Sequence, residues 1–75
     1  MISYRGNLEE CLESASQDKV WTKKEREILN KIAHGTGDVK SIPWGTGRIY
    51  WIKGQARYKF YVHESDVGFN IGRTK

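Results

Sequence analysis

The sequence has few of the residues that build cross-links, metal sites and catalytic centres. Cys11 is its one cysteine, so the chain predicts neither an internal disulfide nor a cysteine-ligated zinc site. The two histidines, His34 and His63, lie on different expected elements, and no catalytic triad, carboxylate pair or metal-ligand spacing accompanies them. We therefore expect a protein that is not an enzyme and that needs no cofactor or metal ion.

Long apolar runs are also missing. No stretch is apolar over the length of a membrane span, and the first residues do not follow the pattern of a secretion signal. We therefore expect a cytoplasmic protein without membrane contact. Seventy-five residues with 37% hydrophobic content correspond to one small domain over residues 1–75, and its end from about residue 72 is expected to be a basic tail.

Acidic residues are absent from one long segment. The chain has 13 Lys and Arg and nine Asp and Glu, but five of the cations and none of the acids lie between Val39 and His63. Such asymmetry often marks contact with a polyanion. Lys and Arg on a sheet face also keep that face solvated and block unwanted strand pairing. The charge distribution is compatible with both interpretations.

The same segment is rich in aromatic and β-branched residues. Two such runs around Gly54 predict a β-hairpin over residues 47–63. A two-residue turn with glycine first suits a type II′ hairpin, which favours Gly54-Gln55 as the turn. A turn at Lys53-Gly54 would change the strand partners but not the faces. A three-residue turn would mix the two faces and is not favoured.

Side chains alternate between the two faces of a strand, so the hairpin divides into two groups. The predicted core face pairs Ile49 with Phe60 and consists of Ile49, Trp51, Ala56, Tyr58, Phe60 and Val62. Lys53 lies at the tip of that core face. The predicted outer group combines cations with aromatic side chains and has no acid: Arg48, Tyr50, Ile52, Gln55, Arg57, Lys59, Tyr61 and His63.

Two helices are predicted before the hairpin. Each begins with a capping box, in which a polar N-cap, Asn7 or Thr22, is followed three residues later by Glu. Apolar residues then repeat with helical spacing, which predicts amphipathic helices over residues 8–16 and 23–34. Gly35 supplies the left-handed residue that commonly ends a helix.

The remaining segments are short. Residues 2–5 and 67–71 alternate like strands, whereas residues 35–46, with several glycines and a proline, predict a loop. Trp44 in this loop is expected to fold back onto the core. The fold class is therefore α+β, with two N-terminal amphipathic helices packed on a small antiparallel sheet built around the 47–63 hairpin.

This arrangement predicts a binding module. Cations attract phosphates whatever the sequence, and aromatic rings offer surfaces on which unpaired bases stack. The expected function is nucleic-acid binding, to single strands or to duplex. The alternative is an inhibitor or adaptor of the kind that phages and mobile elements encode, docking on a host protein through the same face. In both cases the candidate contact residues are Arg48, Tyr50, Lys53, Gln55, Arg57, Lys59, Tyr61 and His63.

One local resemblance bears on the nucleic-acid interpretation. Residues 54–60, Gly-Gln-Ala-Arg-Tyr-Lys-Phe, followed by residues 63–67, His-Glu-Ser-Asp-Val, resemble the wing of phage excisionases and related winged-helix proteins. In that family a Gly-Arg-aromatic hairpin is followed by a short Glu-Ser segment. The resemblance implies a hairpin that contacts DNA beside a recognition helix.

Overall fold

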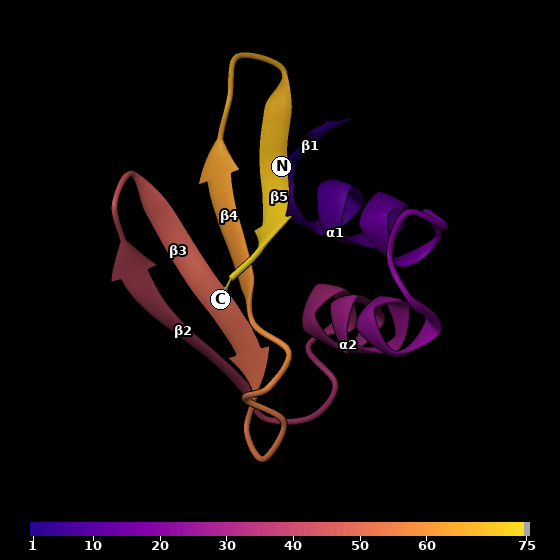
Figure 1. The fold of residues 1–75 in the computed structure, drawn as a ribbon. Helices are drawn as coiled ribbons and strands as arrows, with labels where there is room; N and C mark the ends of the chain where they lie inside the picture. The colour runs from indigo at the N-terminus through magenta and orange to yellow at the C-terminus, as the bar shows by residue number, and fades with distance from the viewer. Residues whose placement is uncertain (75) are drawn as a thin grey trace.

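Five antiparallel strands form one sheet, and two helices cover one of its faces (Figure 1). The computed structural model describes residues 1–74. In chain order the elements are β1 (Ile2–Arg5), α1 (Leu8–Ser16), α2 (Lys23–His34), β2 (Val39–Trp44), β3 (Gly47–Ile52), β4 (Phe60–Glu64) and β5 (Gly68–Arg73). The strand order across the sheet is β1-β5-β4-β3-β2, so β1 and β2 are the edges. The predicted α+β class is confirmed.

Both helices have the predicted bounds because their capping signals are local. The Asn7 side chain accepts a hydrogen bond from the Glu10 N–H at 2.8 Å, and the Glu10 carboxylate accepts one from the Asn7 N–H at 2.9 Å. Thr22 and Glu25 form the same reciprocal pair. Gly35 ends α2 with a φ of +66°, in the left-handed region that glycine enters without strain.

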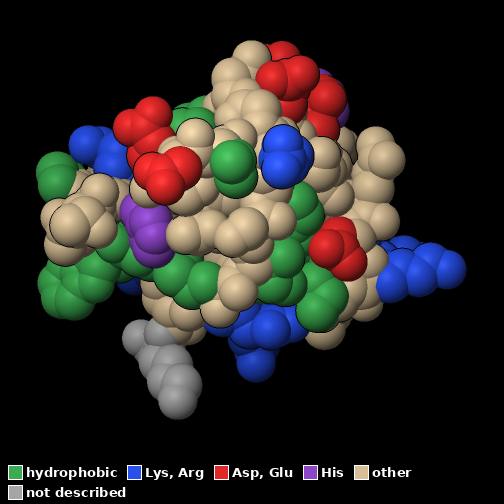
Figure 2. Space-filling model, turned by 90° about the horizontal axis from the view of Figure 1, so that it is seen from above, with side chains coloured by type: hydrophobic (Ala, Val, Ile, Leu, Met, Phe, Trp, Pro, Cys, Tyr) green, Lys and Arg blue, Asp and Glu red, His purple; other side chains and the backbone are tan. Residues whose placement is uncertain are grey.

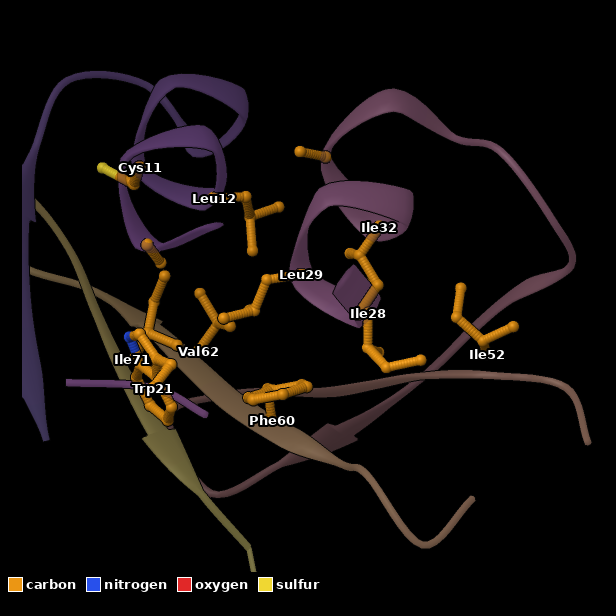
Figure 3. Packing of buried hydrophobic residues seen from close by; sticks show 12 residues of the cluster. Cys11, Leu12, Trp21, Ile28, Leu29, Ile32, Ile52, Phe60, Val62 and Ile71 are labelled. Carbon is orange, nitrogen blue, oxygen red and sulfur yellow. The ribbon is translucent and has the colours of Figure 1, made fainter. Parts of the chain in front are cut away.

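The core lies between the helices and the inner side of β3, β4 and β5. Phe60 is 1% exposed, and Trp21 meets its ring edge-to-face at 5.6 Å. Figure 3 shows side chains of both helices pointing toward this part of the sheet. The buried cluster consists of Cys11, Leu12, Ala15, Trp21, Ile28, Leu29, Ile32, Ala33, Ile52, Phe60, Val62 and Ile71.

The central hairpin differs from the predicted one in its connection. Residues 53–59 join β3 to β4 through two consecutive turns. The Gln55 N–H donates to the Ile52 carbonyl at 2.8 Å, and the Tyr58 N–H donates to the Gln55 carbonyl at 3.0 Å. Gly54 has a φ of +85°, so it serves the first of these turns and does not begin a type II′ hairpin turn.

Because of this longer connection, the face of β3 that points toward the helices is the opposite of the predicted one. Ile49 pairs with Tyr61 and not with Phe60, so the predicted register is wrong by one residue. A shift of one residue moves every side chain of a strand to the opposite face. Tyr50 and Ile52 therefore face the helices, while Trp51 and Ile49 face away. Phe60 and Val62 are buried as predicted.

A strand replaces most of the predicted 35–46 loop. Val39–Trp44 forms β2, an edge strand, and an edge tolerates Pro43 because half of its N–H groups need no partner. The two-residue turn with glycine first occurs here, at Gly45-Thr46, where Gly45 has a φ of +56°. Trp44 is 63% exposed, so the prediction that it covers the core is wrong.

The C-terminal strand continues into the segment that was predicted to be a tail. The expected strand over residues 67–71 is observed as β5, Gly68–Arg73. Gly72 pairs with Tyr61, and the Thr74 hydroxyl donates to the Lys59 carbonyl at 3.3 Å. The structure therefore differs from the predicted basic tail from about residue 72, because residues 72 and 73 belong to β5 and Thr74 bonds to Lys59. Lys75 lies outside the described residues.

Arg73 joins the end of β5 to the start of α2. Its guanidinium donates two hydrogen bonds to the Glu25 carboxylate, at 2.6 and 2.9 Å, and lies 4.8 Å from the centroid of the Trp21 ring. Trp21 in turn donates its Nε1–H to the Tyr4 hydroxyl at 3.0 Å. Glu25 thus takes part in a helix cap and in an ion pair that connects α2 to β5. The hydrogen bond from Trp21 to Tyr4 makes a second connection, to β1.

The register can be tested with two isoleucines that lie on opposite faces of β3. Ile52→Ala should lower the free energy of unfolding by about 2–5 kcal/mol, because this side chain fills the core. Ile49→Ala, on the opposite face of β3, should cost about 1 kcal/mol or less. Urea denaturation measures both changes. A larger loss at Ile49 than at Ile52 would support the predicted register instead.

The Glu25–Arg73 pair predicts a specific acid sensitivity. The hydrogen bonds from Arg73 lower the pKa of the Glu25 carboxyl, and burial only partly opposes this effect. Because the folded pKa lies below the unfolded one, the pair stabilises the fold above the unfolded value and loses this contribution as pH falls through the folded one.

Wild-type protein should therefore lose more stability than Glu25→Gln between about pH 5 and about pH 2, measured by urea unfolding. Glu27→Gln is the matched control, since Glu27 is exposed and its nearest cation, Lys24, is 3.9 Å away. Superimposable acid profiles for wild type and Glu25→Gln would contradict the prediction.

Candidate functional site

The sheet face that the helices leave uncovered has a distinctive composition. We call this surface the outer face, and define it by the strand residues whose side chains alternate away from the core. They are Ser3, Arg5, Lys40, Ile42, Trp44, Gly47, Ile49, Trp51, Tyr61, His63, Gly68, Asn70 and Gly72. None of them is acidic. The nine Asp and Glu residues all lie on the helices, in the connections or on the inner side of the sheet.

Two rows across the strands supply its apolar and aromatic part. Ile42 pairs with Ile49, and Ile49 pairs with Tyr61, so these three side chains are neighbours on the outer face. In the next row, the Lys59 ammonium lies 5.1 Å from the centroid of the Trp51 ring. Such a position over a ring holds a cation by electrostatic attraction to the π system. The surface therefore combines apolar contact area with a positioned positive charge.

A shallow pocket of about 470 Å³ opens on this surface, and we call it the outer hollow. Its lining residues are Ile42, Trp44, Ile49, Lys59, Tyr61, Arg73 and Thr74. Ile42 and Trp44 are exposed although both are large hydrophobic residues. Figure 2 looks down on the end of the molecule that carries the β2–β3 and β4–β5 turns. Hydrophobic side chains, in green, lie at the surface on the side of the β2–β3 turn.

A polar row lies beside the hollow. The Ser3 hydroxyl donates to Asn70 Oδ1, and the Asn70 amide donates to His63 Nε2 at 3.0 Å. His63 Nε2 is then an acceptor, so the neutral imidazole carries its hydrogen on Nδ1. That atom is buried and has no hydrogen-bond partner within residues 1–74. The rings of Tyr61 and His63 are 5.4 Å apart. The row orients His63 without using its second nitrogen.

The eight predicted contact residues do not share one face. Lys59, Tyr61 and His63 lie on the outer side, as predicted. Arg48 and Tyr50 lie on the inner side, because the register of β3 is reversed. The Arg48 guanidinium donates to the Ser41 hydroxyl at 3.2 Å, and Tyr50 packs against the core.

The other three predicted residues lie in the connection between β3 and β4. Lys53 and Arg57 are exposed there and Gln55 is half-buried. The Arg57 guanidinium lies 5.9 Å from the Tyr58 ring centroid, within reach of a cation–π contact. These residues form a basic loop at the opposite end of β3 from Trp44. The predicted contact residues are therefore divided among the outer face, the inner side of β3 and this loop.

Sequence reasoning missed the contribution of β2 and misplaced that of β3. Lys40, Ile42 and Trp44 lie in the segment predicted to be a loop, and Ile49 and Trp51 belong to the face predicted to be the core. The signal that would have identified them is the pair of strand-like runs on either side of Gly45-Thr46, with glycine first in the turn. The proline within the first run obscured that signal.

The exposure of the three tryptophans gives a direct check on this geometry. Trp21 is 2% exposed and Trp44 is 63% exposed, while Trp51 is half-buried under Lys59. Acrylamide quenching should therefore act mainly on Trp44, and Trp44→Phe should remove most of the quenchable emission. Trp21→Phe should leave the quenchable fraction higher than in wild type. A Trp44 as protected as Trp21 would contradict the structure.

No group of three or more His, Cys, Asp or Glu side chains is arranged to hold a metal ion in the described part of the chain. Within residues 1–74, neither helix has the length and apolar character required to cross a membrane. Comparison of the chain with protein-family models, with curated proteins and with solved structures gives no match in any of the three.

Proposed function

We propose that this protein is a small non-enzymatic module that binds nucleic acid through its outer face, and that it acts in the cytoplasm. The observation that carries the proposal is the coincidence, on one uncovered surface, of aromatic rings and cations with no acidic residue. A polyanion with aromatic bases is the ligand class that complements both properties.

The distribution of charge over the molecule supports this orientation. Six of the nine acidic residues lie in residues 8–34, which form the helix layer and its connection. Residues 8–34 also hold five of the 13 Lys and Arg, so their net charge is −1, while the rest of the chain carries +5. A polyanion is therefore attracted mainly to the sheet side, which favours encounters with the outer face. Lys59 is the cation that belongs most directly to the aromatic surface, since it lies over Trp51.

The basic loop over residues 53–59 supports a different mode of the same function. The excisionase resemblance covers this loop and β4, and it implies that such a hairpin contacts DNA. In this mode the hairpin tip enters a groove of duplex DNA. Lys53 and Arg57 would then make the phosphate contacts, and the outer face would be secondary. Substitutions in the two regions distinguish these modes.

A protein partner is the second candidate, and one observation favours it. Ile42 and Trp44 are 46% and 63% exposed on a projecting edge hairpin, and exposed aromatic residues are frequent in interface hot spots. Under this alternative the chain is a phage-type inhibitor or adaptor whose outer face docks on a host protein.

The proposal predicts salt-dependent binding of a generic oligonucleotide, measured by fluorescence anisotropy. With three or four phosphate contacts, the plot of log affinity against log salt should have a slope of roughly −2 to −4. Lys59→Ala should reduce the magnitude of that slope by about one contact and weaken binding. Lys31→Ala, an exposed lysine on α2, is the matched control and should change neither quantity.

The outcomes separate the candidates. Loss of affinity in Lys53→Ala and Arg57→Ala, with Lys59→Ala unaffected, would indicate the loop mode. No measurable binding to any oligonucleotide at low salt would overturn the nucleic-acid proposal. Recovery of one stoichiometric protein partner after nuclease treatment would then support the inhibitor alternative.

A further inference from the structure

We infer that the outer hollow receives one unpaired base, so that the ligand of the outer face is a single-stranded nucleic acid. The inference rests on the proposed function and specifies the ligand class at that site.

The hollow has the shape and lining of a site for a flat ring. Ile42, Ile49 and Tyr61 form a continuous row across three adjacent strands, which provides an apolar floor. Trp44 lines the hollow from β2 at the end of the hairpin. The Thr46 hydroxyl lies 3.4 Å from the Tyr61 hydroxyl, so the turn is tied to the phenol that lines the floor.

A lining of this kind contacts the face of a base and not its edge. In a duplex, neighbouring base pairs cover each face, and only the edges are accessible in the grooves. Aliphatic and aromatic side chains gain contact with a base face only when the base is unstacked and unpaired. The volume of about 470 Å³ lies within the range of small-molecule pockets, so the hollow has room for one base.

Polar groups at the rim match the rest of a nucleotide. The Lys59 ammonium is available for a phosphate, since its nearest partner is the Trp51 ring and not a carboxylate. The second cation that lines the hollow, Arg73, is already engaged by Glu25 through two hydrogen bonds. Lys59 is therefore the phosphate contact in this inference, and the Tyr61 and Thr74 hydroxyls can bond to a base edge.

In the described part of the chain, no helix lies on the outer face to enter a duplex groove. Both helices pack on the opposite side of the sheet (Figure 1), so neither reaches a major groove from this surface. Duplex binding would have to use Lys53 and Arg57 of the basic loop, since Lys59, the last residue of that connection, lines the hollow itself. The inference therefore predicts that the protein prefers single strands to duplex and that Trp44 contributes to the single-strand affinity.

The test compares an unstructured oligothymidylate with a duplex of the same length, by anisotropy at one low salt concentration. The single strand should bind at least about tenfold more tightly, and Trp44→Ala should weaken it by about 5- to 100-fold, as for loss of one stacked base. Trp44→Phe should retain most of the affinity because it keeps a ring. Val20→Ala, which trims another exposed hydrophobic residue away from the sheet, should have no effect.

Tryptophan emission gives a second readout. Binding of the single strand should quench fluorescence in wild type, and this quenching should be mostly lost in Trp44→Phe. Thermal melting shows whether each variant is folded, and the high exposure of Trp44 predicts unchanged midpoints.

Equal affinity for duplex and single strand would overturn the inference and leave the proposed function standing. Unchanged single-strand affinity in folded Trp44→Ala, together with weaker binding in Lys59→Ala, would also overturn the inference and leave the proposed function standing. Absence of binding to both oligonucleotides would remove the proposed function itself.

Discussion

The structure depends on one-sided burial of its sheet. Helices of nine and 12 residues can cover only one face of a five-stranded sheet, and residues 1–74 contain no further element for the other face. The apolar side chains of α1 and α2 accordingly meet those of β3, β4 and β5 in a single layer around Phe60. The outer face stays open, and its large apolar residues, Ile42 and Trp44, remain accessible. An open face of this composition is what makes the chain a candidate binding module.

The two layers are held in place by contacts that converge on Trp21. Its ring packs on Phe60, its indole N–H reaches Tyr4, and Arg73 covers it while binding Glu25. The Glu25 carboxylate is shared between the helix cap and the ion pair, so the start of α2 and the end of β5 stabilise one another. This arrangement commits Arg73 to structure, and leaves Lys59 as the cation of the outer hollow that is free for a ligand.

The connection between β3 and β4 decides which aromatic residues face the ligand side. With residues 53–59 as two turns, Trp51 lies outside and Tyr50 inside; a two-residue turn would have reversed them. The same connection places Lys53 and Arg57 away from the outer face, although both are close in sequence to Lys59, which lies on it. Two binding modes thus become physically distinct: groove contact by the loop, and base stacking on the sheet.

The sequence by itself determined the features that depend on near neighbours. Both helices were predicted residue by residue, since Asn7 and Thr22 cap them through bonds within one turn. The α+β class, the burial of Phe60 and the lack of acidic residues in the hairpin region were also predictable. The tertiary structure alone decided the register of β3, the edge strand that presents Trp44, and the pairing of Arg73 with Glu25, 48 residues apart. These features depend on which segments, distant in sequence, meet one another in the fold. Local propensity does not determine which strands pair in the sheet.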